Sequence, residues 1–208
     1  MTSESRRDPV SDELITPENA VLLLIDYQPV QVQSIESTDR IDMVRKAVIT
    51  VELAQAYGVP VIHSTVNVAT GRNKSTIPQL ARLLGDVPVY DRTSINAWED
   101  DEFKAAVKAT GRRKLIIAAL WTEACLTFPT MDALKEGYDV FPVVDAVGGT
   151  SVIAHETALR RVAGAGAQLV SIAQLACELQ RDWNRAETVP AFVTELVELG
   201  AFPPSALG

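Results

Sequence analysis

Residues 114–144 read KLIIAALWTEACLTFPTMDALKEGYDVFPVV, and this stretch decides the expected fold. An apolar run is followed by a short polar turn, a segment of helical periodicity and a second apolar run. This order predicts a strand, a helix and a strand, with Cys125 where the first strand passes into the helix. Unpaired N–H groups and the helix dipole favour negative charge there, which can lower a thiol pKa from about 8.5 by about one unit or more. Cys125 is therefore a candidate nucleophile.

The same alternation extends in both directions from this stretch. Apolar runs predict six strands, and the segments between them have apolar residues at helical spacing. The strands are expected at 20–26, 60–66, 87–90, 114–120, 138–146 and 167–173, and the helices at 38–58, 100–111, 123–137, 152–165, 174–184 and 189–199. Near-continuous apolar strands separated by helices are typical of a parallel sheet covered on both faces. We therefore expect an α/β fold, a three-layer α/β/α sandwich with a mostly parallel, Rossmann-like six-stranded sheet.

The length of 208 residues suits one sizeable core and requires no second domain. Residues 1–18 are polar and are expected to form a loosely held N-terminal arm. Residues 19–185 are expected to form the single domain. Residues 186–208 are expected to form a C-terminal helix and tail, packed on the domain or on a partner subunit.

The composition excludes several classes of function. A net charge of −8 and short basic runs argue against a nucleic-acid partner or an acidic membrane surface. The N-terminus lacks the apolar segment of a signal peptide, and no apolar run approaches the roughly 18 residues of a membrane span. Two cysteines do not make a disulfide framework. We therefore expect a reduced, cytoplasmic protein.

Cofactor motifs are missing as well. His63 and His155 are the two histidines, and neither lies in an HxxxH, CxxC or DxH pattern. No GxGxxG follows the first expected strand, and no GxxxxGK[ST] occurs in the chain. The sequence predicts no metal site and no cofactor.

Three reactive side chains lie at the carboxyl ends of expected strands, where parallel sheets bind their ligands. Asp26 closes the run AVLLLID, Arg92 follows VPVY and Cys125 follows KLIIAAL. Each also has a structural interpretation: Asp26 as a helix cap or ion-pair partner, Arg92 as a solvated loop cation and Cys125 as a buried apolar residue. Cys177 lies mid-helix and is expected to be a buried structural cysteine.

This arrangement resembles the isochorismatase-like cysteine hydrolases, which include nicotinamidases and N-carbamoylsarcosine amidases. The resemblance covers most of residues 18–182 and is closest to the YcaC-like bacterial hydrolases. It rests on LLLIDYQ at 22–28, INAWEDDEF at 95–103, the stretch 114–146 and HETALRRVAGAGAQLVS at 155–171.

The resemblance implies a catalytic triad with Asp26 as base, Cys125 as nucleophile and the residue at 92 as the cation. Arg92 stands where the family most often has lysine, although the YcaC-like subgroup also tends to carry arginine. Guanidinium stays charged, so Arg92 can orient Asp26 and stabilise a thiolate but is a poor proton shuttle. The resemblance further implies a cis peptide between Leu120 and Trp121, and an oxyanion hole formed by the backbone N–H groups of Trp121 and Cys125.

The resemblance also bears on the substrate. Nicotinamidases bind a divalent ion through a DxHxxxxH-type run, which the loop STVNVATGRNKST (64–76) lacks, so nicotinamide is not the expected substrate. An apolar and aromatic set of residues suggests a small, rather nonpolar molecule. The expected substrate-binding residues are Tyr27, Gln28, Trp98, Trp121, Thr122 and Phe128.

The leading hypothesis is a metal-independent cysteine hydrolase acting on a small amide or related C–N bond. True isochorismatases cleave a vinyl ether without this nucleophile, so the reaction class stays open. The alternatives are a non-catalytic small-molecule binder or oligomeric scaffold of the same fold, and an oxidant-sensitive thiol protein. Apolar residues at 183–199 without an evident core to enter predict a homo-oligomer, with dimer, tetramer and octamer all open. The alternative is that this segment folds back on its own sheet.

Overall fold

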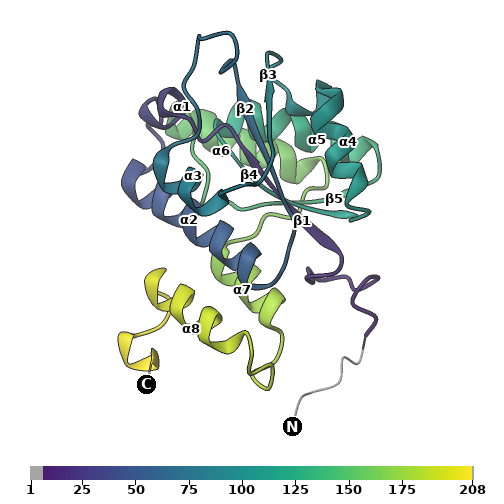
Figure 1. The fold of residues 1–208 in the computed structure, drawn as a ribbon, viewed down its shortest axis with the longest axis vertical. Helices are drawn as coiled ribbons and strands as arrows, with labels where there is room; N and C mark the ends of the chain where they lie inside the picture. Colours follow the sequence, from purple (N-terminus) through teal and green to yellow (C-terminus); the bar gives the residue numbers. More distant parts are fainter. Residues whose placement is uncertain (1–6, 208) are drawn as a thin grey trace.

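The computed structural model describes residues 7–207, which are built around a five-stranded sheet (Figure 1). The strands are β1 (Ala20–Ile25), β2 (Val61–Val66), β3 (Val89–Arg92), β4 (Lys114–Ala119) and β5 (Asp139–Pro142). They lie in the order β3-β2-β1-β4-β5, and every neighbouring pair is parallel. The chain winds outward from β1 in one direction and from β4 in the other, so the point where ligands bind in such sheets lies between these two strands.

Helices cover both faces of the sheet. They are α1 (Pro29–Gln33), α2 (Arg40–Ala56), α3 (Pro78–Leu84), α4 (Asp101–Ala109), α5 (Thr127–Lys135), α6 (Val152–Gly164), α7 (Ile172–Gln180) and α8 (Val189–Glu198). Three short helical turns are η1 (Ala97–Glu99), η2 (Thr122–Leu126) and η3 (Pro204–Leu207). Figure 1 shows α2 and α3 on one side of the sheet and α4 and α5 on the other. None of the helices between residues 7 and 207 is both long and apolar enough to cross a membrane.

The alternation of side chains along β1 explains why the protein has two cores. Leu22 and Leu24 join a cluster with residues of α2, α3, α7 and α8. Leu23 and Ile25 point the other way and join a cluster with residues of α4, α5 and α6. All six residues of β1 are buried, as expected for a central strand covered on both faces. The predicted three-layer sandwich is confirmed.

The prediction of a sixth strand at 167–173 was wrong. Val170 forms a single bridge with Val143, and the chain then turns at Ser171 into α7. The Ser171 hydroxyl accepts a hydrogen bond from Gln174 N, so it caps the helix. A capped helix start at this point leaves the strand no room to extend.

The two ends of the described chain pack more closely than the sequence suggested. Within the predicted N-terminal arm, Ile15 is fully buried and its N–H donates to Glu178 at 2.7 Å. Residues 1–6 of that arm lie outside the described residues. At the other end Phe192 and Leu196 of α8 belong to the same core as α2 and α7. The apolar face of α8 therefore folds back on its own domain.

Candidate functional site

Asp26 follows β1 directly and is fully buried. Its backbone has a left-handed φ of 61°, which L residues other than asparagine and aspartate seldom adopt. Its N–H donates to Ser64 O at 3.0 Å, which ties the end of β1 to the end of β2. Strained backbone of this kind concentrates at functional sites.

Arg92 is the last residue of β3, and both terminal nitrogens of its guanidinium donate to the Asp26 carboxylate. Nη1 lies 2.8 Å from Oδ1 and Nη2 lies 2.7 Å from Oδ2. The two side chains are 1% and 0% exposed, so this bidentate ion pair is withdrawn from water. Arg92 also donates to Ser64 Oγ, Thr65 O and Ile95 O. Arg92 therefore has a fixed position, and it holds Asp26 in one orientation.

The pKa of Arg92 is raised despite this burial. Burial alone lowers the pKa of a guanidinium, but the hydrogen bond and charge of Asp26 outweigh that effect. Arg92 therefore remains charged. The expectation that it orients Asp26 rather than shuttles a proton agrees with this electrostatic balance.

Cys125 lies in η2, a five-residue π-helical turn between β4 and α5. Such turns are rare in helical structure and occur frequently at functional sites. The thiol is 7% exposed and lies against Asp26, to which its S–H can donate. The three reactive side chains predicted from the strand ends thus meet at one edge of the sheet.

The environment of Cys125 raises the thiol pKa instead of lowering it. Burial is the main cause, and the charge and hydrogen bond of Asp26 act in the same direction. Arg92 and the N–H of Trp121 oppose the shift without reversing it. The expected lowering of the thiol pKa at a helix start was therefore wrong, because burial beside Asp26 raises it.

The segment before Cys125 has the backbone geometry that the resemblance implied. The peptide bond between Leu120 and Trp121 is cis. The Trp121 N–H lies within hydrogen-bonding reach of the Cys125 sulfur. Thr122 is fully buried, its N–H donates to Gly148 O at 2.9 Å, and its hydroxyl pairs with His155 Nδ1 at 2.8 Å. Thr122 therefore holds the turn in place.

The structure brings only some of the expected substrate-binding residues to this edge. Tyr27 is fully buried with its hydroxyl on Ala146 O, and Gln28 binds the loop after β2 through Val66 and Lys74. Trp98 packs at 5.4 Å against Tyr138, beyond the end of α5 that is remote from Cys125. These three side chains support the protein framework.

Trp121 and Phe128 flank η2 and are both half-buried. The indole N–H of Trp121 donates to Ser34 Oγ at 2.6 Å. These two aromatic residues are the members of the expected set that combine partial exposure with a position beside Cys125.

Ser64 was missed by the sequence reasoning. Its hydroxyl accepts from Arg92 Nη1 at 2.9 Å and donates to Tyr90 O at 2.8 Å, so it links β2 and β3 under the ion pair. A small polar residue near the end of a buried strand is the signal that could have identified it. Ser64 pairs in register with Ile25, directly before Asp26.

The residues after β2 do not suit a divalent ion of the nicotinamidase kind. His63 Nε2 lies 2.7 Å from Thr76 Oγ1, and the Asp91 carboxylate accepts from the N–H groups of Val68 and Ala69. Among the described residues, one group of acidic side chains is close enough to share an ion: Glu52, Glu195 and Glu198. It lies on α2 and α8 rather than at the strand ends.

Comparison with known proteins identifies the family. A family model described as the isochorismatase domain matches residues 20–174. The probable hydrolase YcaC of Escherichia coli is 38% identical over 167 residues, 80% of each chain. This chain belongs to the isochorismatase family. It is a hydrolase, and the resemblance found in its sequence is confirmed.

Solved structures support the same assignment. E. coli YcaC, described as an octameric hydrolase of unknown specificity, has a TM-score of 0.85 at 33% identity, covering 94% of this chain and 93% of that chain. YcaC from Pseudomonas aeruginosa, solved with hexane-2,5-diol and covalent acrylamide, has a TM-score of 0.84 at 32% identity, covering 93% and 94%. The nicotinamidase PncA of Bacillus subtilis, at 17% identity and a TM-score of 0.63, shares the fold alone; the match covers 74% of this chain and 99% of that one.

Proposed function

We propose that this isochorismatase-family hydrolase is a metal-independent cysteine hydrolase that cleaves a small amide or a related C–N bond. One observation carries the proposal: the Cys125 thiol lies against the carboxylate of Asp26, which Arg92 holds by two hydrogen bonds. A nucleophile, a base within reach and a group that orients the base are the parts that covalent catalysis requires.

In the first half of the reaction, Asp26 accepts the thiol proton as the Cys125 sulfur forms a bond to the substrate carbonyl carbon. In this mechanism the N–H groups of Trp121 and Cys125 receive the negative charge that develops on the carbonyl oxygen, and one such donor contributes roughly 10²-fold in rate. The C–N bond then breaks, and the amine leaves with the proton that Asp26 held. A thioester remains on Cys125.

In the second half, water attacks the thioester and Asp26 accepts its proton. The C–S bond breaks, the acid leaves and the proton returns to the Cys125 sulfur. The sum is hydrolysis of an amide to an acid and an amine. Arg92 stays charged throughout and keeps the two carboxylate oxygens of Asp26 in place.

The raised thiol pKa favours a mechanism in which the thiol loses its proton to Asp26 only as its sulfur attacks the carbonyl carbon. A thiol that stays protonated until a base and a carbonyl meet it suits coupled proton transfer. It argues against the oxidant-sensing alternative, because sensor thiols combine a low pKa with exposure. A pure scaffold does not need the buried ion pair beside the thiol.

Two properties of the relatives support the proposal. Acrylamide forms covalent adducts with nucleophiles, and the P. aeruginosa YcaC structure holds it covalently. The E. coli YcaC structure is octameric, which supports a homo-oligomer for this chain as well. We infer a cytoplasmic protein whose partners are a small-molecule substrate and further copies of itself.

The test is hydrolysis of a panel of small amides, carbamoyl compounds and nitriles by the wild-type protein, with and without EDTA. We expect turnover of at least one compound, unchanged by EDTA and reduced at least about 10³-fold in Cys125→Ala. Turnover that EDTA abolishes, or that Cys125→Ala retains, would refute the mechanism. A panel without any turnover would refute the substrate class.

A further inference from the structure

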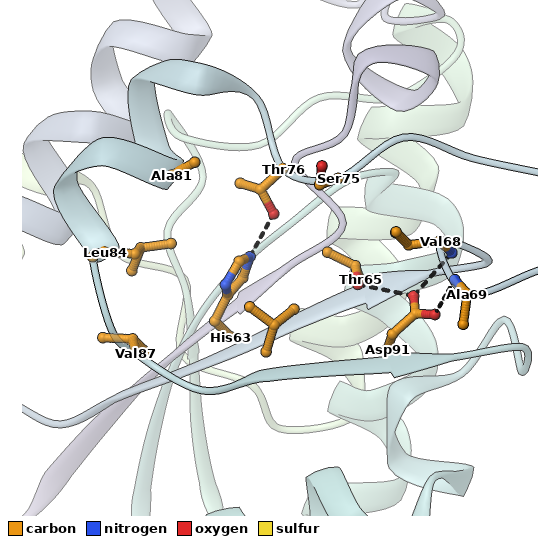
Figure 2. Close-up of a pocket in the computed structure, with 12 residues that line it drawn as sticks. His63, Thr65, Val68, Ala69, Ser75, Thr76, Ala81, Leu84, Val87 and Asp91 are labelled. Carbon is orange, nitrogen blue, oxygen red and sulfur yellow. Dashed lines mark hydrogen bonds between the residues drawn. The ribbon is translucent and has the colours of Figure 1, made fainter. Parts of the chain in front are cut away.

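Figure 2 shows a cavity of about 440 Å³ against β2 and β3. His63 in its wall pairs with Leu24, which belongs to the core on one face of the sheet, whereas Cys125 belongs to the core on the other face. The walls of the cavity come from β2, β3, α3 and the loop 67–77 that follows β2. The volume falls within the range of about 300–1,000 Å³ that is typical of small-molecule sites. Neither Asp26, Arg92 nor Cys125 lines it.

The alternation of side chains separates this cavity from the catalytic edge. Ser64 and Arg92 point toward Asp26, whereas their neighbours His63, Thr65 and Asp91 line the cavity. Successive residues of a strand face opposite sides of the sheet. The same two strands thus build the catalytic ion pair on one face and the cavity on the other.

His63 carries a buried ring nitrogen without a hydrogen-bond partner among the described residues. It is 3% exposed, and its Nε2 pairs with the Thr76 hydroxyl at 2.7 Å. Its Nδ1 is buried and has no hydrogen-bond partner among the described residues. Figure 2 shows the second ring nitrogen on the side of Leu84 and Val87. Burial lowers the His63 pKa to about 4, so the ring is neutral near pH 7 and this nitrogen has an unused hydrogen-bonding capacity.

The carboxylate of Asp91, the charged group of the wall, already has hydrogen-bond partners within the protein. The Asp91 carboxylate accepts from Thr65 Oγ1 at 2.9 Å, Val68 N at 3.1 Å and Ala69 N at 2.8 Å. Most of the hydrogen-bonding capacity of this carboxylate is therefore used within the protein, and its negative charge disfavours an anionic ligand. Its remaining surface is mostly apolar.

We propose that this cavity binds a small neutral molecule, mostly apolar, whose single hydroxyl or comparable polar group hydrogen-bonds Nδ1 of His63. The apolar body of the ligand packs against α3 and β3. Its polar group supplies the hydrogen-bond partner that this buried nitrogen lacks among the described residues.

The site is also connected to the catalytic edge. Ile77 N donates to Tyr27 O at 2.9 Å, and Gln28 Nε2 donates to Lys74 O at 2.6 Å. The loop that walls the cavity is thereby bonded to the two residues that follow Asp26. Binding itself does not depend on the hydrolase activity, so it can be tested separately.

The experiment is ligand-observed saturation-transfer NMR on the full chain, with cyclohexanol and phenol as probes. We expect saturable binding to the wild-type protein and to Cys125→Ala, in which the cavity is intact. His63→Leu removes the unpaired nitrogen at similar volume and should weaken binding about tenfold. Leu84→Trp should abolish binding by filling the cavity. If thermal unfolding shows that the Leu84→Trp protein does not fold, Ala81→Phe is used as the cavity-filling variant instead.

Three results would overturn the proposal. The first is the absence of saturable binding of either probe to the wild-type protein. The second is unchanged binding in either His63→Leu or the cavity-filling variant. The third is loss of binding in Cys125→Ala, which would place the probe at the catalytic edge.

Discussion

At the scale of single residues, the buried ion pair of Asp26 and Arg92 bears on stability and on the proposed chemistry. Two opposite charges with side-chain exposures of 0% and 1% are stable only together. The same pair determines the environment of the Cys125 thiol, because Asp26 raises its pKa and Arg92 opposes the rise. A change at any of the three residues should therefore affect the other two.

Asp26→Asn should lower the free energy of unfolding by about 3–5 kcal/mol, because it leaves the Arg92 charge buried without a counter-ion. Asparagine tolerates the left-handed φ of 61° at this position, so backbone strain is not the cause. The double variant Asp26→Asn, Arg92→Met should recover much of the loss. Urea unfolding of the single and double variants measures the coupling, and a loss below about 1 kcal/mol in Asp26→Asn would show that the pair contributes little to stability.

At the scale of elements, the contact between α8 and α2 carries a titratable group. Glu195 of α8 is buried, and one of its carboxylate oxygens has no hydrogen-bond partner among the described residues. Burial raises its pKa to about 7 from an ordinary value of 4.5, and the charges of Glu52 and Glu198 add to the shift. The folded protein therefore holds a proton that the unfolded chain has already released between these two pH values.

The contribution of Glu195 to stability should accordingly fall as the pH rises from about 4.5 to about 7, and this loss should be complete above that window. His63, whose pKa is lowered from 6.5 to about 4, acts in the opposite direction over much of the same range, so the Glu195 contribution is read from the difference between variant and wild type. Glu195→Gln should remove this fall and stabilise the protein above pH 7 by roughly 1–3 kcal/mol. Glu198→Gln, at an exposed position of the same helix, is the matched control and should have a much smaller effect. Thermal unfolding across this pH range measures both, and a Glu195→Gln curve parallel to the wild type would contradict the assignment.

The elements also show what sequence patterns can predict. The run AVLLLID predicted β1 because a strand covered on both faces is apolar throughout. The five residues of α1 and the seven of α3 are too short for helical periodicity to indicate them. The apolar run at 167–173 has the pattern of a strand, and periodicity does not reveal that Ser171 caps a helix.

The sequence predicted the members of the candidate site but not the chemical environment of the thiol. The convergence of Asp26, Arg92 and Cys125 follows from the rule that parallel strands end at one edge, so the sequence sufficed. The raised thiol pKa depends on burial and on the distance to a carboxylate, which no local pattern contains. Tyr27 and Gln28 adjoin Asp26 in the chain, but their hydrogen bonds to Ala146 and Lys74 show that they brace the framework.

At the scale of the whole molecule, the apolar surface lies elsewhere than the sequence suggested. Phe192 and Leu196, expected to meet a partner, are 4% and 2% exposed within the domain. Ile41 at the start of α2 and Ile153 at the start of α6 are instead 82% and 68% exposed. The segments before these two helices are joined, because the N–H groups of Glu36 and Ser37 donate to Gly149 O. Each of these two exposed apolar side chains is a candidate for burial in a contact between copies of the chain.

Light scattering should give a mass of at least two chains, each of 22.5 kDa. Ile153→Asp should shift the mass toward that of the monomer, because it places a charge in the expected contact. Val10→Asp, at a position that is 66% exposed on the N-terminal segment, is the control and should leave the mass unchanged. A wild-type mass near 22.5 kDa at micromolar concentration would rule out the oligomer.

The central claim for the molecule is that Cys125 carries the substrate acyl group. Its most direct test uses the amides of the panel that the protein hydrolyses. Each reaction is quenched rapidly with acid, and the intact protein is analysed by mass spectrometry. The protein carries Cys177→Ser, because Cys177 is exposed in the structure and not buried as its helix pattern suggested. We predict a mass increase equal to the acyl group, located on Cys125 by peptide mapping and absent from Cys125→Ala. Hydrolysis at the full rate by the Cys125→Ala variant would contradict the account.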